Sequence, residues 1–203
     1  MPDVPDETRR FVVGLGNPGR SYERTRHNVG FRVLAVLRRR WGVEGARSAF
    51  GGQVSEARPT RGGAGERRVR LLEPHTYMNR SGLAVREMAA FYKAGLDEIL
   101  VVLDDMNLPV GRLRARAGGS AGGQKGLADV MARLGTDRVP RLRIGIGQPP
   151  AFMDGVDYVL SKFTPDEEEI AAEAVETAAD AVEDWVFCGL SFVMDKYNGK
   201  PES

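Results

Sequence analysis

Three short apolar segments carry the clearest structural signal in the chain. Residues 11–15 (FVVGL) and 99–103 (ILVVL) are uninterrupted apolar runs, which predict strands buried on both faces in the middle of a sheet. Residues 141–146 instead alternate arginine with leucine or isoleucine. This period of two predicts a strand on which Arg141 and Arg143 form a polar face.

Apolar residues at helical spacing predict helices between these strands. The segments are 29–41, 81–93 and 127–134, the last of which follows a glycine-rich turn. Residues 47–73 indicate two strands joined by a turn at 58–66. Strands and helices therefore alternate along the chain, which is typical of an α/β fold.

The longest predicted helix begins at a capping signal. Thr164 and Glu167 have the spacing of a capping box, and Pro165 occupies the first helical position. Apolar residues continue at helical spacing through Trp185. We therefore expect a long helix near the end of the chain, lying against the sheet.

The composition excludes several classes of protein. The single cysteine, Cys188, excludes an internal disulfide and every Cys-rich zinc site. No apolar run approaches the roughly 18 residues of a membrane span, and the polar residues 1–10 lack a signal-peptide core. We expect a soluble, cytoplasmic protein with a single domain over residues 1–203 and flexible ends at 1–8 and 198–203.

A glycine motif after the first strand fits dinucleotide binding only in part. Residues 14–19 read GLGNPG, which matches GxGxxG. That motif must itself open a helix, whereas the polar residues 20–28 delay the apolar helix here. Arginines occupy 38–40, where an acidic residue is expected about 20 positions on. A nicotinamide-dependent oxidoreductase is therefore the weakest of the functions considered.

Two further motifs fall within the glycine loop at 118–126. The GxSxG match around Ser120 requires a later histidine, but His27 and His75 both precede it. The segment GGQKG resembles a phosphate loop but lacks a glycine before Lys125 and a serine or threonine after it. A glycine-rich turn that enters a helix is the simpler interpretation, and such a turn can still offer backbone N–H groups to an anion.

Polar residues follow two of the predicted strands. Asn17 comes after residues 11–15, and Asp104 comes directly after 99–103. If the strands are parallel neighbours, these side chains share one rim of the sheet, and His27 can fold back onto it. A histidine held by a carboxylate is a general base for water or for a nucleophile. A capping histidine beside a solvated strand end remains the simpler alternative at this point.

Five ordered blocks together make the chain resemble the bacterial-type peptidyl-tRNA hydrolase family. They cover roughly residues 10–198 and read FVVGLGNPG with TRHNVGF, then PHTYMNRSG, DDMNLPVG, GGSAGGQKG and RLRIGIG. The resemblance implies a monomeric α/β fold with a central twisted, mixed β-sheet flanked by helices. It also implies hydrolysis of the ester that joins a peptide to the terminal ribose of tRNA, with no cofactor or metal.

The resemblance also implies roles for individual residues. His27 is expected to activate water as a general base, with Asp104 orienting its imidazole. Asn17 and Asn79 are expected to position the peptide end of the substrate and the water or carbonyl group. Tyr22 and Tyr77 match positions that contact the nucleotide end, where aromatic faces stack on unpaired bases.

One departure from the family lies in the glycine loop. Gln124 and Lys125 stand where the family usually carries histidine and asparagine. Lys125 is expected either to pair with a phosphate or to weaken recognition of the peptide. The departure leaves room for a second interpretation, in which the chain is an RNA-binding protein that kept this fold and lost hydrolysis, as in relatives that assist intron splicing.

The near-neutral net charge of +1 hides two opposed regions. Residues 112–143 are strongly basic, whereas 166–184 carry acids and no base. Because the basic region adjoins the glycine loop, we expect Arg114, Arg116 and Arg143 to bind the tRNA backbone largely without reading its sequence. The expected partner is therefore the acceptor end of peptidyl-tRNA, with no obligate protein partner.

Overall fold

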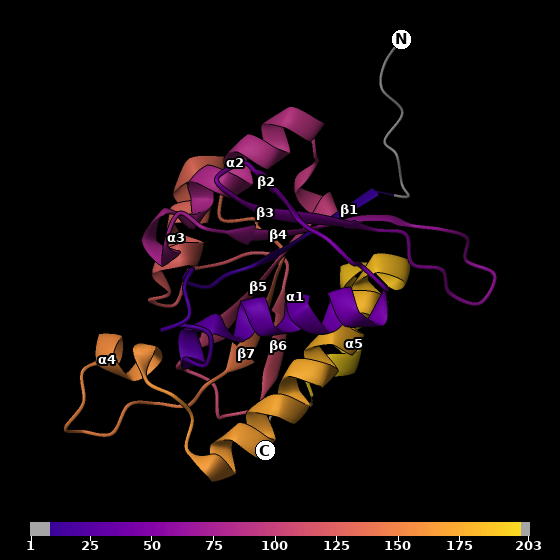
Figure 1. Ribbon diagram of the computed structural model, residues 1–203. Helices are drawn as coiled ribbons and strands as arrows, with labels where there is room; N and C mark the ends of the chain where they lie inside the picture. The colour runs from indigo at the N-terminus through magenta and orange to yellow at the C-terminus, as the bar shows by residue number, and fades with distance from the viewer. Residues whose placement is uncertain (1–8, 200–203) are drawn as a thin grey trace.

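One mixed sheet forms the centre of the computed structural model, which describes residues 9–199 (Figure 1). Its strand order is β2-β3-β4-β1-β5-β7-β6, and the inner strands β4, β1, β5 and β7 run parallel. The strands are β1 (Arg9–Gly14), β2 (Arg47–Ala49), β3 (Gly52–Ala57), β4 (Arg68–Pro74), β5 (Ile99–Asp105), β6 (Leu113–Arg116) and β7 (Arg141–Gly145). The outer pairs β2/β3, β3/β4 and β6/β7 are antiparallel, which confirms the mixed sheet.

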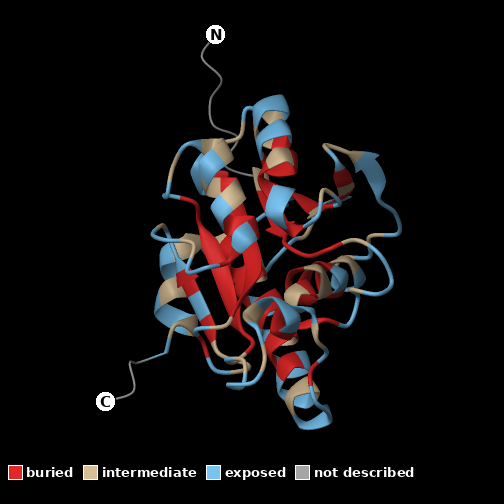
Figure 2. Ribbon diagram, turned by 90° about the vertical axis from the view of Figure 1, so that its left-hand side faces the viewer, coloured by how far each residue is buried: buried red, intermediate tan, exposed pale blue. Residues whose placement is uncertain are grey.

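Helices cover both faces of this sheet. One hydrophobic core lies under α1 and α5, and a second lies under α2 and α3. Figure 2 shows the buried strands between these helical layers. The helices are α1 (Val29–Arg40), α2 (Ser81–Tyr92), α3 (Lys125–Leu134), α4 (Gly155–Leu160) and α5 (Pro165–Tyr197), with short 3-10 turns η1 (Arg26–Asn28), η2 (Met78–Arg80) and η3 (Leu96–Glu98). Within the described residues, every helix is too short or too polar to span a membrane.

The helix boundaries follow the predicted signals closely. Thr164 accepts a hydrogen bond from the backbone of Glu167, which completes the capping box at the start of α5. α2 ends where Lys93 adopts a left-handed conformation with φ 50°. α5 is interrupted at Gly189, where φ is 80° and ψ is 177°. The predicted apolar periodicity ran only through Trp185 and therefore did not reach this interruption.

One strand prediction needs correction. Residues 47–73 form three strands rather than two, because Phe50 and Gly51 adopt positive φ values of 54° and 66° and close a tight hairpin. The predicted strand with Arg141 and Arg143 on one face is present as β7, and all five of its residues are buried. Arg143 is covered because it donates to Asp105 Oδ2 and to the Ser120 carbonyl, each at 2.7 Å.

The acidic face of α5 lies against arginines of α1 and η1. Glu167 pairs with Arg26 at 2.6 Å, and Glu168 pairs with Arg32 at 2.6 Å. Further along α5, Glu176 pairs with both Arg39 and Arg40. The acids of α5 are therefore balanced largely within the fold, and the basic residues 112–143 are not neutralised by them.

The end of the described chain is anchored rather than free. Asn198 Oδ1 accepts from the backbone N–H of Ala115 at 2.6 Å, and its Nδ2 donates to the Ala115 carbonyl at 3.1 Å. Arg112 donates to the Asn198 carbonyl at 2.7 Å. Asn198, the first residue of the predicted flexible end, is thus hydrogen-bonded to β6 and Arg112, while the predicted flexible residues 1–8 and 200–203 lie outside the described part of the chain.

Candidate active site

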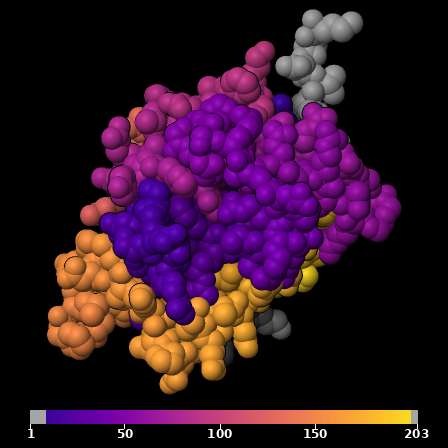
Figure 3. Space-filling model, viewed as in Figure 1, coloured from indigo at the N-terminus to yellow at the C-terminus, as the bar shows by residue number. Residues whose placement is uncertain are grey.

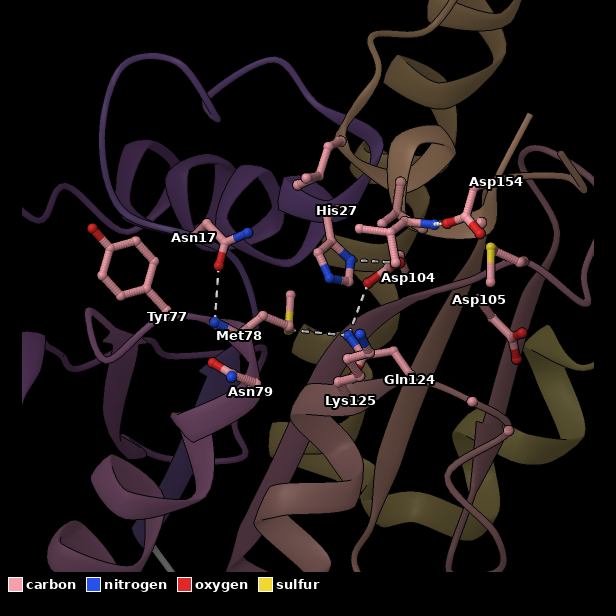
Figure 4. A pocket seen from close by; sticks show the side chains of 17 residues that line it. Asn17, His27, Tyr77, Met78, Asn79, Asp104, Asp105, Gln124, Lys125 and Asp154 are labelled. Carbon is pink, nitrogen blue, oxygen red and sulfur yellow. Dashed lines mark hydrogen bonds and ion pairs between the residues drawn. The ribbon is translucent and has the colours of Figure 1, made fainter.

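A pocket of about 560 Å³ opens at the rim of the sheet where β1 and β5 end (Figure 4). Six of the ten predicted site residues line it, and they come from five separate segments of the chain. They are Asn17, His27, Tyr77, Asn79, Asp104 and Lys125. The expectation that the carboxyl ends of two parallel strands share one rim with His27 is confirmed.

The parallel pairing of β1 and β5 brings Asn17 and Asp104 together. Gly14 lies opposite Val102 in the register, so both strands end at the same edge. η1 then carries His27 back over this edge. The close approach of α1 depends on glycine, because a Cβ atom at Gly30 would lie 2.5 Å from the Leu15 carbonyl oxygen.

A buried arginine fixes the position of η1. Arg26 lies between the rings of Tyr158 and Phe163, with centroid distances of 4.2 and 4.6 Å. It donates to the Ile146 carbonyl at 3.1 Å and pairs with Glu167. The segment around α4 consequently lies against the segment that carries His27, as Figure 3 shows. The backbone preceding His27 is therefore held by aromatic packing, a carbonyl and a carboxylate together.

His27 and Asp104 form a direct pair. His27 Nδ1 lies 2.9 Å from Asp104 Oδ2, and the two side chains are only 11% and 2% exposed. Because a carboxylate only accepts, the pairing assigns the proton of neutral imidazole to Nδ1 and leaves Nε2 as an acceptor. Figure 4 shows this second nitrogen facing the interior of the pocket.

The two adjacent aspartates have different partners. Successive residues of a strand point to opposite faces, so Asp105 cannot share the partner of Asp104. Asp105 Oδ2 accepts from Arg143 at 2.7 Å, and its Oδ1 accepts from the Asn107 backbone at 2.8 Å. Asp104 alone is therefore available to His27.

The amide of Asn17 has a defined orientation. Its Oδ1 accepts from the Met78 backbone N–H at 2.8 Å, so Nδ2 is directed into the pocket as a donor (Figure 4). Asn28 holds the Asn17 backbone from both sides, with two hydrogen bonds of 2.9 Å. Asn17 can thus donate a hydrogen bond to a carbonyl oxygen bound beside His27.

Tyr77, Asn79 and Lys125 form the outer rim of the pocket. The Tyr77 side chain is 56% exposed, and its backbone has φ 60° and ψ 157°, which is unusual for a residue other than glycine. Asn79, in the middle of η2, and Lys125, the first residue of α3, are also exposed. These side chains are free to meet a molecule that enters from solvent.

The remaining predicted site residues lie outside the pocket lining. Tyr22 is in the loop between β1 and η1, and Arg114 and Arg116 are exposed on the edge strand β6. Arg143 is buried and paired with Asp105, which differs from the expected exposed phosphate contact. Opposite charges close to one another in the fold explain this burial.

Three residues of the site were given no role from the sequence, although Gln124 was noted as a departure from the family pattern. Gln124 donates to Asp104, Asn28 holds Asn17, and Arg26 anchors η1. Arg26 and Asn28 lie directly beside His27 in the TRHNVGF block, and this position could have identified them as site residues. Residues 9–199 contain no cluster of three or more His, Cys, Asp or Glu side chains that could hold a metal ion.

Comparison with known proteins points to one family. A family model described as peptidyl-tRNA hydrolase matches residues 11–203. Over 93% of its length the chain is 47% identical to the peptidyl-tRNA hydrolases of Rhodopirellula baltica and Chloroflexus aggregans, and it covers 97% and 98% of them. The crystal structure of peptidyl-tRNA hydrolase from Acinetobacter baumannii superimposes with a TM-score of 0.84 at 33% identity, covering 95% of this chain and 96% of that one.

Proposed function

The chain belongs to the peptidyl-tRNA hydrolase family, and we propose that it hydrolyses the ester of peptidyl-tRNA with His27 as general base and Asp104 as the carboxylate that orients it. The single observation that supports these roles is the 2.9 Å contact between His27 Nδ1 and Asp104 Oδ2 at the wall of the pocket. An ester is activated enough for attack by water that a positioned imidazole deprotonates.

The proposed reaction needs only water and the side chains of the pocket. His27 Nε2 accepts a proton from water as the water oxygen bonds to the ester carbonyl carbon. The imidazolium then returns this proton to the ribose oxygen as the ester C–O bond breaks. The products are a free peptide carboxylic acid and tRNA with a free hydroxyl group. Asp104 keeps Nδ1 protonated and stabilises the transient imidazolium.

Two amides are proposed to hold the acyl end of the substrate. Asn17 Nδ2 lies on the pocket side of its amide and has the polarity needed to donate to the carbonyl oxygen as that oxygen gains charge (Figure 4). Asn79 lines the same wall and is proposed to bind the peptide backbone. Neutral amides suit these tasks because they hydrogen-bond to peptide groups without competing as bases.

Isotope incorporation tests the proposed chemistry. In a single turnover of N-acetyl-aminoacyl-tRNA in ¹⁸O-water, general-base hydrolysis places the label in the released N-acetyl amino acid and leaves the protein unmodified. Mass spectrometry of the acid-quenched reaction measures both products. An acylated histidine would contradict the general-base role, because it would make His27 a nucleophile. Binding of the substrate without release would instead favour the non-catalytic RNA-binding interpretation.

The exposed arginines of β6 are proposed to contact the tRNA backbone. Arg114 and Arg116 point away from the core under α5, and the structure gives them no ion pair within residues 9–199. Replacing both with Ala should make the plot of log affinity against log salt concentration shallower by about 1 to 2, since each lost phosphate contact removes roughly 0.7–0.9 from the slope. Fluorescence anisotropy of deacylated tRNA at several salt concentrations measures this slope.

A charge-matched double variant provides the control. Arg39 and Arg58 are exposed arginines whose charges are already paired, with Glu176 at 2.6 Å and Glu66 at 2.7 Å. Replacing these two with Ala changes the net charge equally and should leave the slope within error of wild type. An unchanged slope for the Arg114 and Arg116 variant would place the tRNA on another surface.

A further inference from the structure

Gln124 uses both ends of its side-chain amide inside the fold. Nε2 donates to Asp104 Oδ1 at 3.0 Å, and Oε1 accepts from the Leu127 backbone N–H at 2.7 Å. The residue is 8% exposed and caps the N-terminus of α3. A single buried amide therefore joins the first turn of a helix to the carboxylate that holds His27.

The orientation of this amide follows from its partners. Reversing it would place an oxygen against the Asp104 carboxylate and an N–H group against the Leu127 N–H. Both contacts would then be repulsive, so the amide can only donate toward Asp104. Nε2 also lies 3.2 Å from Met78 Sδ, and the Met78 backbone in turn fixes Asn17.

Asp104 is held between two donors. Its Oδ2 accepts from His27 and its Oδ1 accepts from Gln124, while the residue is 1% exposed. Two bonds on opposite oxygens fix the plane of the carboxylate, and that plane determines where the imidazole ring lies. Without the Gln124 bond, Oδ1 would be a buried charged acceptor with no donor in the described residues, which is costly.

We infer that Gln124 is a positioning residue of the hydrolytic reaction: by donating to Asp104 Oδ1 it sets the geometry of the His27–Asp104 pair. The inference rests on the proposed roles of His27 and Asp104. Gln124 also precedes Lys125, which lines the same pocket. Through the N-cap of α3, Gln124 therefore connects Lys125 at the rim of the pocket to Asp104.

Two variants remove the hydrogen bond that Gln124 donates to Asp104 while keeping an acceptor that caps α3. Gln124→Glu keeps the size of the side chain and an acceptor for Leu127 but presents an oxygen to Asp104. Gln124→Ser offers a hydroxyl that caps helices well and is too short to reach Asp104. We expect kcat for N-acetyl-aminoacyl-tRNA to fall by about 10–100-fold in both, in the range seen when a group that orients an active-site ligand is lost. KM should stay within about two-fold of wild type.

Separate controls test whether the variants still fold and whether the added negative charge alone lowers kcat. Thermal unfolding of both variants should remain a single cooperative transition, at a lower midpoint than wild type because the buried Asp104 Oδ1 loses its donor. Gln53, whose amide bonds to Ser48 on the distant β2–β3 hairpin, supplies the matched change Gln53→Glu, which should leave kcat unchanged. A wild-type kcat in Gln124→Glu or Gln124→Ser, or a rise in KM with kcat preserved, would overturn the inference.

A double-mutant cycle shows whether Gln124 acts through Asp104. In an Asp104→Asn background, Gln124→Glu should cause little further loss, because the partner that Gln124 orients is already altered. An equal loss of kcat in both backgrounds would mean that Gln124 acts elsewhere and would overturn the positioning role. If instead Asp104→Asn alone retains wild-type activity, the proposed function fails, and that result is distinct from the behaviour of Gln124.

Discussion

Replacing His27 with Ala is expected to lower kcat for hydrolysis of N-acetyl-aminoacyl-tRNA by about 10²–10⁴-fold, the usual contribution of a positioned general base. The reason is geometric: the imidazole is fixed through Nδ1 at 2.9 Å from Asp104, and its other nitrogen faces the pocket. Truncation removes the group that accepts the proton from water. Release of the labelled N-acetyl amino acid under saturating substrate measures the effect.

The second histidine of the chain provides a matched control. His75 is exposed and does not line the pocket, although its ring lies 6.2 Å from that of Phe31. His75→Ala should therefore retain kcat close to that of wild type. Affinity of His27→Ala for deacylated tRNA should also be preserved, since His27 is proposed to act on the ester. Equal hydrolysis by wild type and His27→Ala would exclude the general-base role.

Replacing Asp104 with Asn is the second change with a large expected effect. The amide would turn either an oxygen or an N–H group toward His27, and an N–H group there requires the proton of neutral imidazole to move to Nε2. That tautomer cannot accept a proton from water at Nε2, so kcat should fall by about 10²–10⁴-fold. KM should change little, because Asp104 is buried behind His27 and is 1% exposed.

Asp97 supplies the control for this substitution. It is exposed in η3, at the opposite end of β5 from Asp104. Asp97→Asn makes the same change of side chain and charge at a residue that does not line the pocket, and it should leave kcat unchanged. Imidazole ¹⁵N chemical shifts of His27 provide a direct check, since they distinguish the two neutral tautomers. An unaltered tautomer with full activity in Asp104→Asn would contradict the orienting role.

The strands and helices were predicted best where local patterning and tertiary environment agree. Residues 11–15 and 99–103 are apolar throughout because β1 and β5 are buried on both faces in the middle of the sheet. The start of α5 was predicted because its capping box is a local interaction. The short α4 was missed because its six residues have a mixed pattern. The helix packs against η1, where Arg26 lies over the Tyr158 ring.

In the candidate site, too, some residues were predictable from the sequence and others depended on tertiary packing. Strand position pointed to Asn17 and Asp104 sharing one rim with His27, and resemblance to a family added Asn79 and implied roles for all four, which line the pocket. Arg143 was expected to contact the tRNA backbone because it belongs to the basic region beside the glycine loop. The fold instead supplies Asp105 and the Ser120 carbonyl as partners and covers it with the glycine loop. Burial of a charged side chain depends on its partners, and these are not adjacent to it in the sequence.

By itself, the sequence determined the α/β class, the family, the apolar central strands and the residue types available for ester hydrolysis. Only the tertiary structure decided which of these residues meet. His27 and Asp104 are 77 positions apart, and Gln124 is another 20 positions beyond Asp104. Their contacts arise from parallel strand pairing and from the N-terminal cap of α3. A hydrogen bond requires separations near 3 Å, and such separations follow from packing rather than from local pattern.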